Sequence, residues 1–310
     1  MPSYAGFDLG GTQLKYGVID GSGTILFKDK APTPPSIDGL LDLIDFAWSG
    51  LKKHGRHKIA AAGFGIPGIY DLKEKRILQS PNYADLDHFD LYPAIAKRVD
   101  VPFWVDNDAN MAAFGEWACG AGRGVSSMVF LTIGTGIGGG IILDGKLWQG
   151  GSGYAGEVGH LIVNPGGRRC KCGLRGCLET EASAPAIVRK YLALTKKRER
   201  LTAEDVYRRA KKGEAKARRA FAQAGYYLGI GLGILINLLN PEKILLGGGV
   251  MTRGEFLLST AIHEAKRNSY AASFAHCSIE RASLGNDAGL IGSAAWAKEN
   301  LRKTKKPESP

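Results

Sequence analysis

The chain has 310 residues, of which 23% are charged and 44% belong to the hydrophobic set. This length accommodates two domains of ordinary size, and this composition excludes an intrinsically disordered chain. The formal net charge is +11, and the sequence opens without a basic stretch followed by an apolar core, so we expect a cytoplasmic protein without a secretory signal. The longest apolar run, residues 228–239, is shorter than the roughly 20 residues of a membrane span, so we expect no membrane partner.

The N-terminal half predicts an alternation of strands and helices. Short β-rich runs separated by glycine turns predict three strands, and an amphipathic pattern ending at Gly55 predicts the first helix. Two more strands should follow, the second of them leading into a helix and a new unit that starts at residue 127. The expected strands cover residues 4–10, 13–20, 24–29, 58–68 and 102–110, and the helices cover 36–55 and 111–120.

An internal repeat links the two halves of the chain. Residues 6–21 and 130–145 each read as a strand, a glycine- and threonine-rich turn, a second strand and an Asp-Gly pair. Asp20 and Asp144 are 124 residues apart, as are Thr12 and Gly136, so the halves align without a gap. We therefore expect two related α/β domains, although two unrelated glycine-rich hairpins could give the same pattern.

Glycine turns at strand ends suit phosphate binding, because their exposed N–H groups bind anions and glycine lets the ligand approach closely. DLGGT (8–12) and IGTGIGGG (133–140) would hold the triphosphate of a nucleotide, and the turn with Gly248 and Gly249 would approach the adenosine. Asp8 has no carboxylate counterpart in the repeat, which has Thr132 there. Asp8 is therefore predicted to hold Mg²⁺ through water, or alternatively to cap the turn.

Asp108, at the end of a buried strand and flanked by Asn107 and Asn110, is the candidate catalytic base. Phosphoryl transfer needs positioning, charge neutralisation and a group that receives the proton of the nucleophile. Asp106 is the competing carboxylate, and strand alternation predicts that it points the same way but lies deeper. The alternative role of Asp108 is that of a helix N-cap.

Three of the five cysteines form a metal-binding pattern with one histidine. His160, Cys170, Cys172 and Cys177 supply the four donors that tetrahedral Zn²⁺ prefers, and the glycines between them allow a tight wrap. A closed set of four protein ligands predicts a structural ion rather than a catalytic one. The alternative is a vicinal dithiol beside an unrelated histidine. Cys119 and Cys277 are expected to be small buried hydrophobes.

Basic residues are concentrated in 196–219 and 302–306. Within 202–227, apolar residues recur at helical spacing with charges between them, which predicts two amphipathic helices with solvated basic faces. A nucleic-acid surface would need a groove-reading element, and the sequence shows none. The motif at Asp8 leaves no room upstream for a DNA-binding domain, so we expect no nucleic-acid partner.

These motifs together resemble the ROK family (repressor, open reading frame, kinase) of sugar kinases and, within it, the bacterial ATP-dependent glucokinases. The resemblance runs from DLGGT through GIPG (65–68), NDAN (107–110), GTGIGGG (134–140), GEVGH (156–160) and CKCGLRGCLE (170–179) to LGGGV (246–250). It implies an actin-like ATPase fold of two ribonuclease-H-like domains with ATP and sugar in the cleft between them. The expected domains are 1–116, completed by a C-terminal helix at 288–302, and 117–287, followed by a flexible tail at 303–310.

The resemblance also assigns roles. Asp108 would take the proton of the 6-hydroxyl of the sugar, and ATP, Mg²⁺ and a structural Zn²⁺ would be the cofactors. The sugar ligands would be Gly68, Asn82, Asn107, Asp108, Glu157, His160 and Glu179. The phosphate loops would comprise Gly10, Gly11, Thr12 and Lys15, and then Thr135 and Gly136. His160 would give one ring nitrogen to zinc and the other to the sugar.

The predicted activity is transfer of the γ-phosphate of ATP to the 6-hydroxyl of glucose. A kinase for N-acetylhexosamine, mannose or fructose, a non-catalytic sugar-sensing regulator, and polyphosphate as the donor remain open alternatives. The predicted assembly is a homodimer or a homotetramer.

Overall fold

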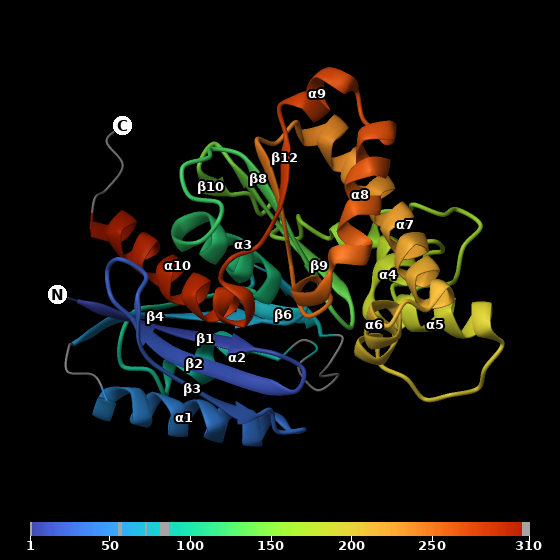
Figure 1. The fold of residues 1–310 in the computed structure, drawn as a ribbon. Helices are drawn as coiled ribbons and strands as arrows, with labels where there is room; N and C mark the ends of the chain where they lie inside the picture. Colours follow the sequence, from blue (N-terminus) through green and yellow to red (C-terminus); the bar gives the residue numbers. More distant parts are fainter. Residues whose placement is uncertain (1, 55–57, 72, 81–86, 88, 306–310) are drawn as a thin grey trace. The chain divides into compact units, whose positions relative to one another are not determined.

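A computed structural model describes residues 2–54, 58–71, 73–80, 87 and 89–305 (Figure 1). The chain divides into two compact units. The first comprises Met1–Gly124, Gly140–Gly156 and Asn286–Pro310, and the second comprises Val125–Gly139 and Glu157–Gly285. This division places residues 117–124, 140–156 and 286–287 in the first unit, whereas the predicted domain limits had placed them in the second. Helix α10 runs to Lys305, so residues 303–305 are helical where a tail was predicted.

The first unit is built on a five-stranded sheet in the order β3-β2-β1-β4-β7. The β1 strand pairs antiparallel with β2 and parallel with β4, and β7 lies parallel beside β4. The strands are β1 (Ser3–Leu9), β2 (Gln13–Ile19), β3 (Ile25–Pro32), β4 (Ile59–Ile66) and β7 (Phe103–Asn107), and a separate hairpin is formed by β5 (Ile69–Asp71) and β6 (Arg76–Gln79).

Helices cover both faces of this sheet (Figure 1). Helix α1 (Ile37–His54) buries Leu40, Ile44 and Trp48 in the core beneath the strands, as its apolar spacing predicts. Helix α10 (Ala288–Lys305) packs on β1, on β4 and on α3. Its close approach requires Gly63 in β4, because a Cβ there would lie 1.8 Å from the carbonyl oxygen of Ser293. The other helices of the unit are α2 (Leu91–Ala96) and α3 (Asp108–Cys119).

A second five-stranded sheet has the order β10-β9-β8-β11-β12. Its strands are β8 (Met128–Ile133), β9 (Ile137–Leu143), β10 (Lys146–Leu147), β11 (Lys243–Gly247) and β12 (Ser278–Arg281). The β11 strand lies parallel to both β8 and β12, and β10 pairs antiparallel with β9. Each sheet thus has its first strand in the centre, its second and third strands on one side and its two parallel strands on the other. The predicted repeat is confirmed at the level of whole sheets.

The second unit is largely helical outside its strands. Helix α7 (Ala215–Leu239) is long and apolar enough to cross a membrane by length and composition, whereas the predicted apolar run covered only its second half. Half of that apolar window is buried, and α7 packs against α4, α5, α6 and α8, which identifies it as the core helix of the unit. The remaining elements are η2 (Val158–His160), α4 (Leu178–Ala182), α5 (Ala184–Thr195), α6 (Ala203–Lys211), η3 (Met251–Arg253), α8 (Glu255–Asn268) and α9 (Ala271–Ala275), and η4 (Gly285–Asp287) spans the limit between the units.

Candidate functional site

The candidate base lies at the junction of β7 and α3. The strand ends at Asn107 and Asp108 is the first residue of α3, so the prediction that Asp108 ends a strand and that the helix starts at residue 111 was wrong. The reason is the cap: the Asn107 side-chain oxygen accepts from the amides of Ala109 and Asn110 at 2.8 and 3.2 Å. Asn107, rather than Asp108, is the N-cap. Asp108 lies half-buried in the first turn, where its Oδ1 accepts from the Ala109 amide at 2.9 Å.

The buried carboxylate of Asp106 stabilises this junction through hydrogen bonds. Its carboxylate accepts hydrogen bonds from the Asn107 amide at 2.7 Å, from Asn110 Nδ2 at 2.9 Å and from Gln149 Nε2. Burial raises the pKa of Asp106 to about 6, and these three donors oppose the shift. As predicted, Asp106 lies deeper than Asp108, and its oxygens are engaged by the protein itself. Gln149 was missed by the sequence analysis because it is 43 residues away in the chain.

The first glycine turn, residues 10–12, joins β1 to β2. Asp8 and Lys15 are directly opposed across the two strands, and Lys15 Nζ lies 3.0 Å from Asp8 Oδ2 and 2.9 Å from the Asn286 carbonyl. Burial raises the pKa of Asp8, and Lys15 opposes that shift. Gly11 and Thr12 are exposed, and the Gly10 carbonyl accepts from Thr33.

Asp8 also lies against the first turn of α10. A Cβ on Gly289 would come within 2.6 Å of the Asp8 carboxyl group, so only glycine admits the carboxylate there. The N-terminal end of a helix favours a negative charge. These contacts support a structural role for Asp8. The role in holding Mg²⁺ stays a prediction.

The second glycine turn, residues 134–136, joins β8 to β9. It is closed by a hydrogen bond from the Gly134 amide to the Gly136 carbonyl at 2.9 Å, and the Gly134 carbonyl accepts from the Ala184 amide at 2.8 Å. Glu179 Oε2 accepts from the Ile137 amide at 3.0 Å. Glu179, expected only among sugar ligands, therefore supports the second glycine turn directly.

A cavity of about 240 Å³ opens beside the second glycine turn, wholly within the second unit. Gly249 and Thr135, both predicted to contact the nucleotide, line it. Gly248, directly before Gly249, has φ +86, and a Cβ there would lie 2.5 Å from the Ile133 backbone. Gly134 and Val250, from the same two predicted turns, also line the cavity, and the rest of the lining was not predicted: Ala184, Ala203, Glu204, Tyr207, Phe221 and Arg253. Periodicity places Tyr207 and Phe221 on helices, but it does not distinguish a cavity wall from a core.

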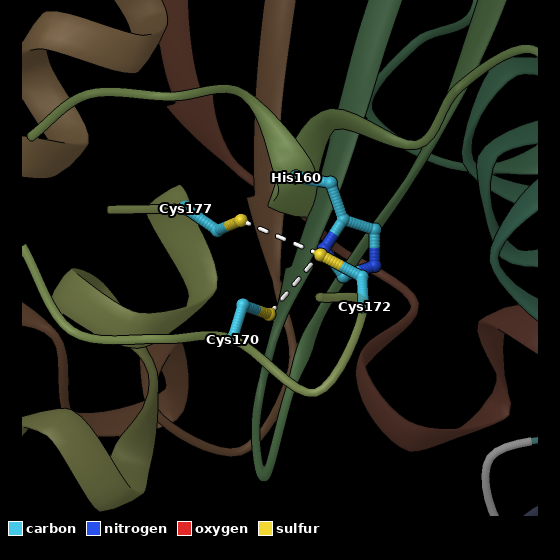
Figure 2. A group of neighbouring side chains, drawn as sticks. All are labelled: His160, Cys170, Cys172 and Cys177. Carbon is cyan, nitrogen blue, oxygen red and sulfur yellow. Dashed lines mark hydrogen bonds between the residues drawn. The ribbon is translucent and has the colours of Figure 1, made fainter. Parts of the chain in front are cut away.

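The four predicted metal ligands form one Cys/His cluster, comprising His160, Cys170, Cys172 and Cys177 (Figure 2). All four donor atoms lie within 4.8 Å of one another. Cys170 Sγ is 3.7 Å from His160 Nδ1, and Cys172 Sγ is 3.6 Å from Cys177 Sγ. Sulfur atoms at about 2.3 Å from one tetrahedral ion would be about 3.8 Å apart, so the spacing fits a single metal ion. Burial raises the pKa of the Cys177 thiol, and a bound cation would favour its thiolate.

Glycines give the cluster its tight backbone. Gly176 has φ +73, and a Cβ there would lie 1.6 Å from the Asn164 carbonyl oxygen. The Gly176 carbonyl in turn accepts from the Val163 amide at 2.9 Å. These contacts hold residues 170–177 against the segment that follows His160.

The predicted sugar ligands fall into two groups. In the first unit, Asn107 Nδ2 donates to the Gly68 carbonyl at 2.9 Å, which keeps Gly68 and Asn107 together beside Asp108. In the second unit, His160 Nε2 lies 3.8 Å from Glu157 Oε2, on the ring side opposite the cysteines. Glu179 is half-buried next to the second glycine turn. Asn82 lies outside the described residues.

Two repeated sheets of this order, each with a glycine turn after its first strand, and a Cys/His cluster beside one of them define an actin-like ATPase fold of the sugar-kinase type. The chain belongs to the ROK family, whose profile matches residues 4–300. A glucokinase from Halalkalibacterium halodurans is 38% identical, with 96% of this chain and 95% of that protein aligned. A ROK family glucokinase from Streptomyces griseus, solved with glucose and AMPPNP, is 34% identical with a TM-score of 0.84, over 96% of this chain and 99% of that one.

The family also contains regulators. The xylose repressor of Bacillus subtilis is 29% identical over 93% of this chain, and the alignment covers 74% of that repressor. The same fold also occurs in a ROK family transcriptional regulator, with a TM-score of 0.86, so the function of this chain depends on its site residues.

Proposed function

We propose that this protein is an ATP-dependent hexose kinase that transfers the γ-phosphate of ATP to the 6-hydroxyl of glucose. The proposal rests mainly on Asp108, whose carboxylate accepts a hydrogen bond from the Ala109 amide at the start of α3, next to the Asn107 cap. Similarity to glucokinases over nearly the whole chain supports the choice of glucose. Cytoplasmic location and a homodimeric or homotetrameric state belong to the same proposal.

Asp108 would accept the proton of the 6-hydroxyl as the oxygen attacks the γ-phosphorus. A general base contributes roughly 10²- to 10⁴-fold to such a step, provided that its carboxylate is fixed within hydrogen-bond reach of the hydroxyl. The first turn of α3 restricts its rotamers, and Asp106 fixes the backbone of the preceding residue. Asn107 would contribute its remaining side-chain N–H to the sugar, since one N–H is already bonded to Gly68.

The glycine turns would hold the nucleotide. The exposed amides of Gly11 and Thr12 would bind phosphate oxygens, with Lys15 adding a positive charge, and the amides at Thr135 and Gly136 would do the same from the second turn. Mg²⁺ bound to the phosphates would neutralise the developing charge, and Asp8 would orient its water ligands. The cavity lined by Gly249, Tyr207 and Arg253 would accept the adenosine.

The Cys/His cluster would hold a structural Zn²⁺ through His160 Nδ1 and three thiolates. The donor set and the spacing fit this ion, and four protein ligands complete its tetrahedron. His160 Nε2, Glu157 and Glu179 would then be available to sugar hydroxyls. A metal-bound histidine has a fixed ring orientation, which would give the sugar a pre-positioned partner.

Steady-state turnover of a sugar panel with Mg²⁺-ATP tests the proposal. The panel comprises glucose, mannose, fructose, N-acetylglucosamine and N-acetylmannosamine, with polyphosphate as an alternative donor. We expect the highest kcat/KM for glucose with ATP. Sugar binding by calorimetry without phosphorylation of any sugar would instead identify a sugar-sensing regulator. Preference for an N-acetylated sugar would refute glucose and retain the reaction type.

A further inference from the structure

The backbone of Ile137, directly after the second glycine turn, is contacted by two segments that each carry a ligand of the Cys/His cluster. Its amide donates to Glu179 Oε2 at 3.0 Å, and Glu179 is two residues after Cys177. Its carbonyl lies against Gly159, the neighbour of His160, where an added Cβ would be only 2.0 Å from the oxygen. Both the amide and the carbonyl of Ile137 are therefore restrained by segments that carry ligands of the Cys/His cluster.

The approach of Glu179 depends on a glycine in the turn itself. A Cβ on Gly136 would lie 2.4 Å from Glu179 Oε2, so any larger residue would displace the carboxylate. A second link comes from the Ala184 amide, which donates to the Gly134 carbonyl at 2.8 Å. The short helix α4 and the start of α5 thus hold the turn at both of its ends.

Helix α4 depends on an external anchor. It has five residues, which is far below the length at which a helix is stable alone. Its N-cap residue is Cys177, whose side chain makes no capping hydrogen bond within the described part of the chain. A bond from the Cys177 thiolate to a metal ion would fix the start of α4, and with it the position of Glu179.

We propose that the metal in the Cys/His cluster, acting through Glu179 as a positioning residue, sets the geometry of the second glycine turn and so makes nucleotide affinity depend on the metal. This inference rests on the proposed zinc and phosphate roles. It extends them, because the cluster was expected to organise only the sugar ligands. The contacts concerned all lie within the second unit.

Calorimetric titration with ADP in the absence of sugar tests this coupling. Glu179→Ala removes the acceptor for the Ile137 amide and should weaken nucleotide binding about tenfold, the usual effect of losing a hydrogen bond to a charged group. Glu179→Gln retains a carbonyl acceptor and should stay within about threefold of the wild type. Glu157→Ala is the matched control: it removes a neighbouring carboxylate and should weaken sugar binding without changing ADP affinity.

The metal arm uses the same titration. Cys172→Ser, at the exposed cysteine of the cluster, and wild-type protein stripped with a zinc-selective chelator should both lose about tenfold in ADP affinity, and added Zn²⁺ should restore the stripped protein. Stripping the Glu179→Ala variant should add little further loss, because both changes act on one contact. Circular dichroism and urea unfolding report whether each variant is folded.

Elemental analysis separates the two ways in which the idea can fail. Wild-type protein without about one zinc per chain would refute the proposed metal site. Zinc-loaded protein whose ADP affinity is the same before and after stripping, and in Glu179→Ala, would refute the coupling and leave the metal site intact. A Glu179→Gln variant as weak as Glu179→Ala would assign the effect to charge rather than to the Ile137 hydrogen bond, which would also overturn the proposed positioning role.

Discussion

The two glycine turns occupy equivalent places in sheets of the same strand order, yet they are supported by different chemistry. The first turn has an ion pair on its own strands, Asp8 with Lys15, at 3.0 Å. The corresponding positions of the repeat are Thr132 and Gly139, so the second turn has no charge of its own. Its carboxylate is Glu179, which comes from the segment after the cysteine cluster.

The ends of the sheets differ in the same way. The last strand of the first sheet, β7, ends at Asn107 and is followed by Asp108, whereas its counterpart β12 is followed by Ala282 and Ser283. The two sheets therefore share one strand order, but the first carries carboxylates and a lysine on and directly after its own strands, whereas the second turn depends on a carboxylate from another segment.

Replacing the proposed base, Asp108, should cause the largest loss of kcat among the substitutions considered. Asp108→Asn should lower kcat by about 10²-fold or more while glucose binding remains measurable, since the amide retains the size of the side chain but accepts no proton. Rapid-quench or coupled-assay kinetics with glucose calorimetry measure both quantities. Near-normal kcat in Asp108→Asn would show that Asp108 is not the base, and β7 would then differ from β12 only in sequence.

The charges of the two turns can be compared by paired substitutions. Asp8→Ala should lower kcat by about 10²-fold and change its dependence on Mg²⁺ concentration, because orienting the metal on the phosphates is worth several kcal/mol. Thr132→Ala, at the equivalent place in the repeat, should cost only a few-fold. The readout is turnover across a magnesium series. Equal loss of turnover, glucose affinity and thermal stability in Asp8→Ala would indicate that Asp8 only stabilises the packing of α10 and does not bind the metal.

A third prediction concerns the pH dependence of stability. Asp106 has a pKa of about 6 in the folded protein, above its ordinary value of 3.8, so the folded state binds its proton more tightly than the unfolded state. Its contribution is therefore fully present below about pH 4 and is lost as pH rises through about 6, by an amount on the order of 3 kcal/mol.

Asp106→Asn isolates that contribution, because the variant does not titrate and Gln149 can turn its amide to pair with the new side chain. Urea unfolding of both proteins between pH 4 and pH 7 gives the difference in their free energies of unfolding. The stability of the wild type relative to the variant should fall over this interval. A relative stability that rises with pH would mean that the three donors outweigh burial and that Asp106 stays ionised.

Much of the fold and of the candidate site could be predicted from local pattern. The apolar spacing of Leu40, Ile44 and Trp48 places α1 on the core, and the 124-residue repeat implies the second sheet. The spacing of His160 and the three cysteines predicts a cluster that the structure brings within 4.8 Å. These signals are readable because each depends on residues close in the chain or on a repeated pattern.

Other features depended on contacts that local pattern does not contain. The start of α3 at Asp108 is set by the Asn107 cap. Asn107 and Asp108 are both good N-cap residues, so the sequence alone does not decide which of them caps the helix. The limits of the units place residues 140–156 with the first unit, because that segment contacts residues distant in sequence, such as Asp106 with Gln149.

The sequence by itself determined the family, the repeated sheets, the glycine turns and the residues of the Cys/His cluster, because these depend on residue types and spacings. Only the tertiary structure decided that Glu179 restrains the Ile137 amide, that Asp8 lies against the first turn of α10, and that Tyr207 and Arg253 face one cavity. The physical reason is that hydrogen bonds and close packing act over about 3 to 4 Å in space whatever the separation along the chain.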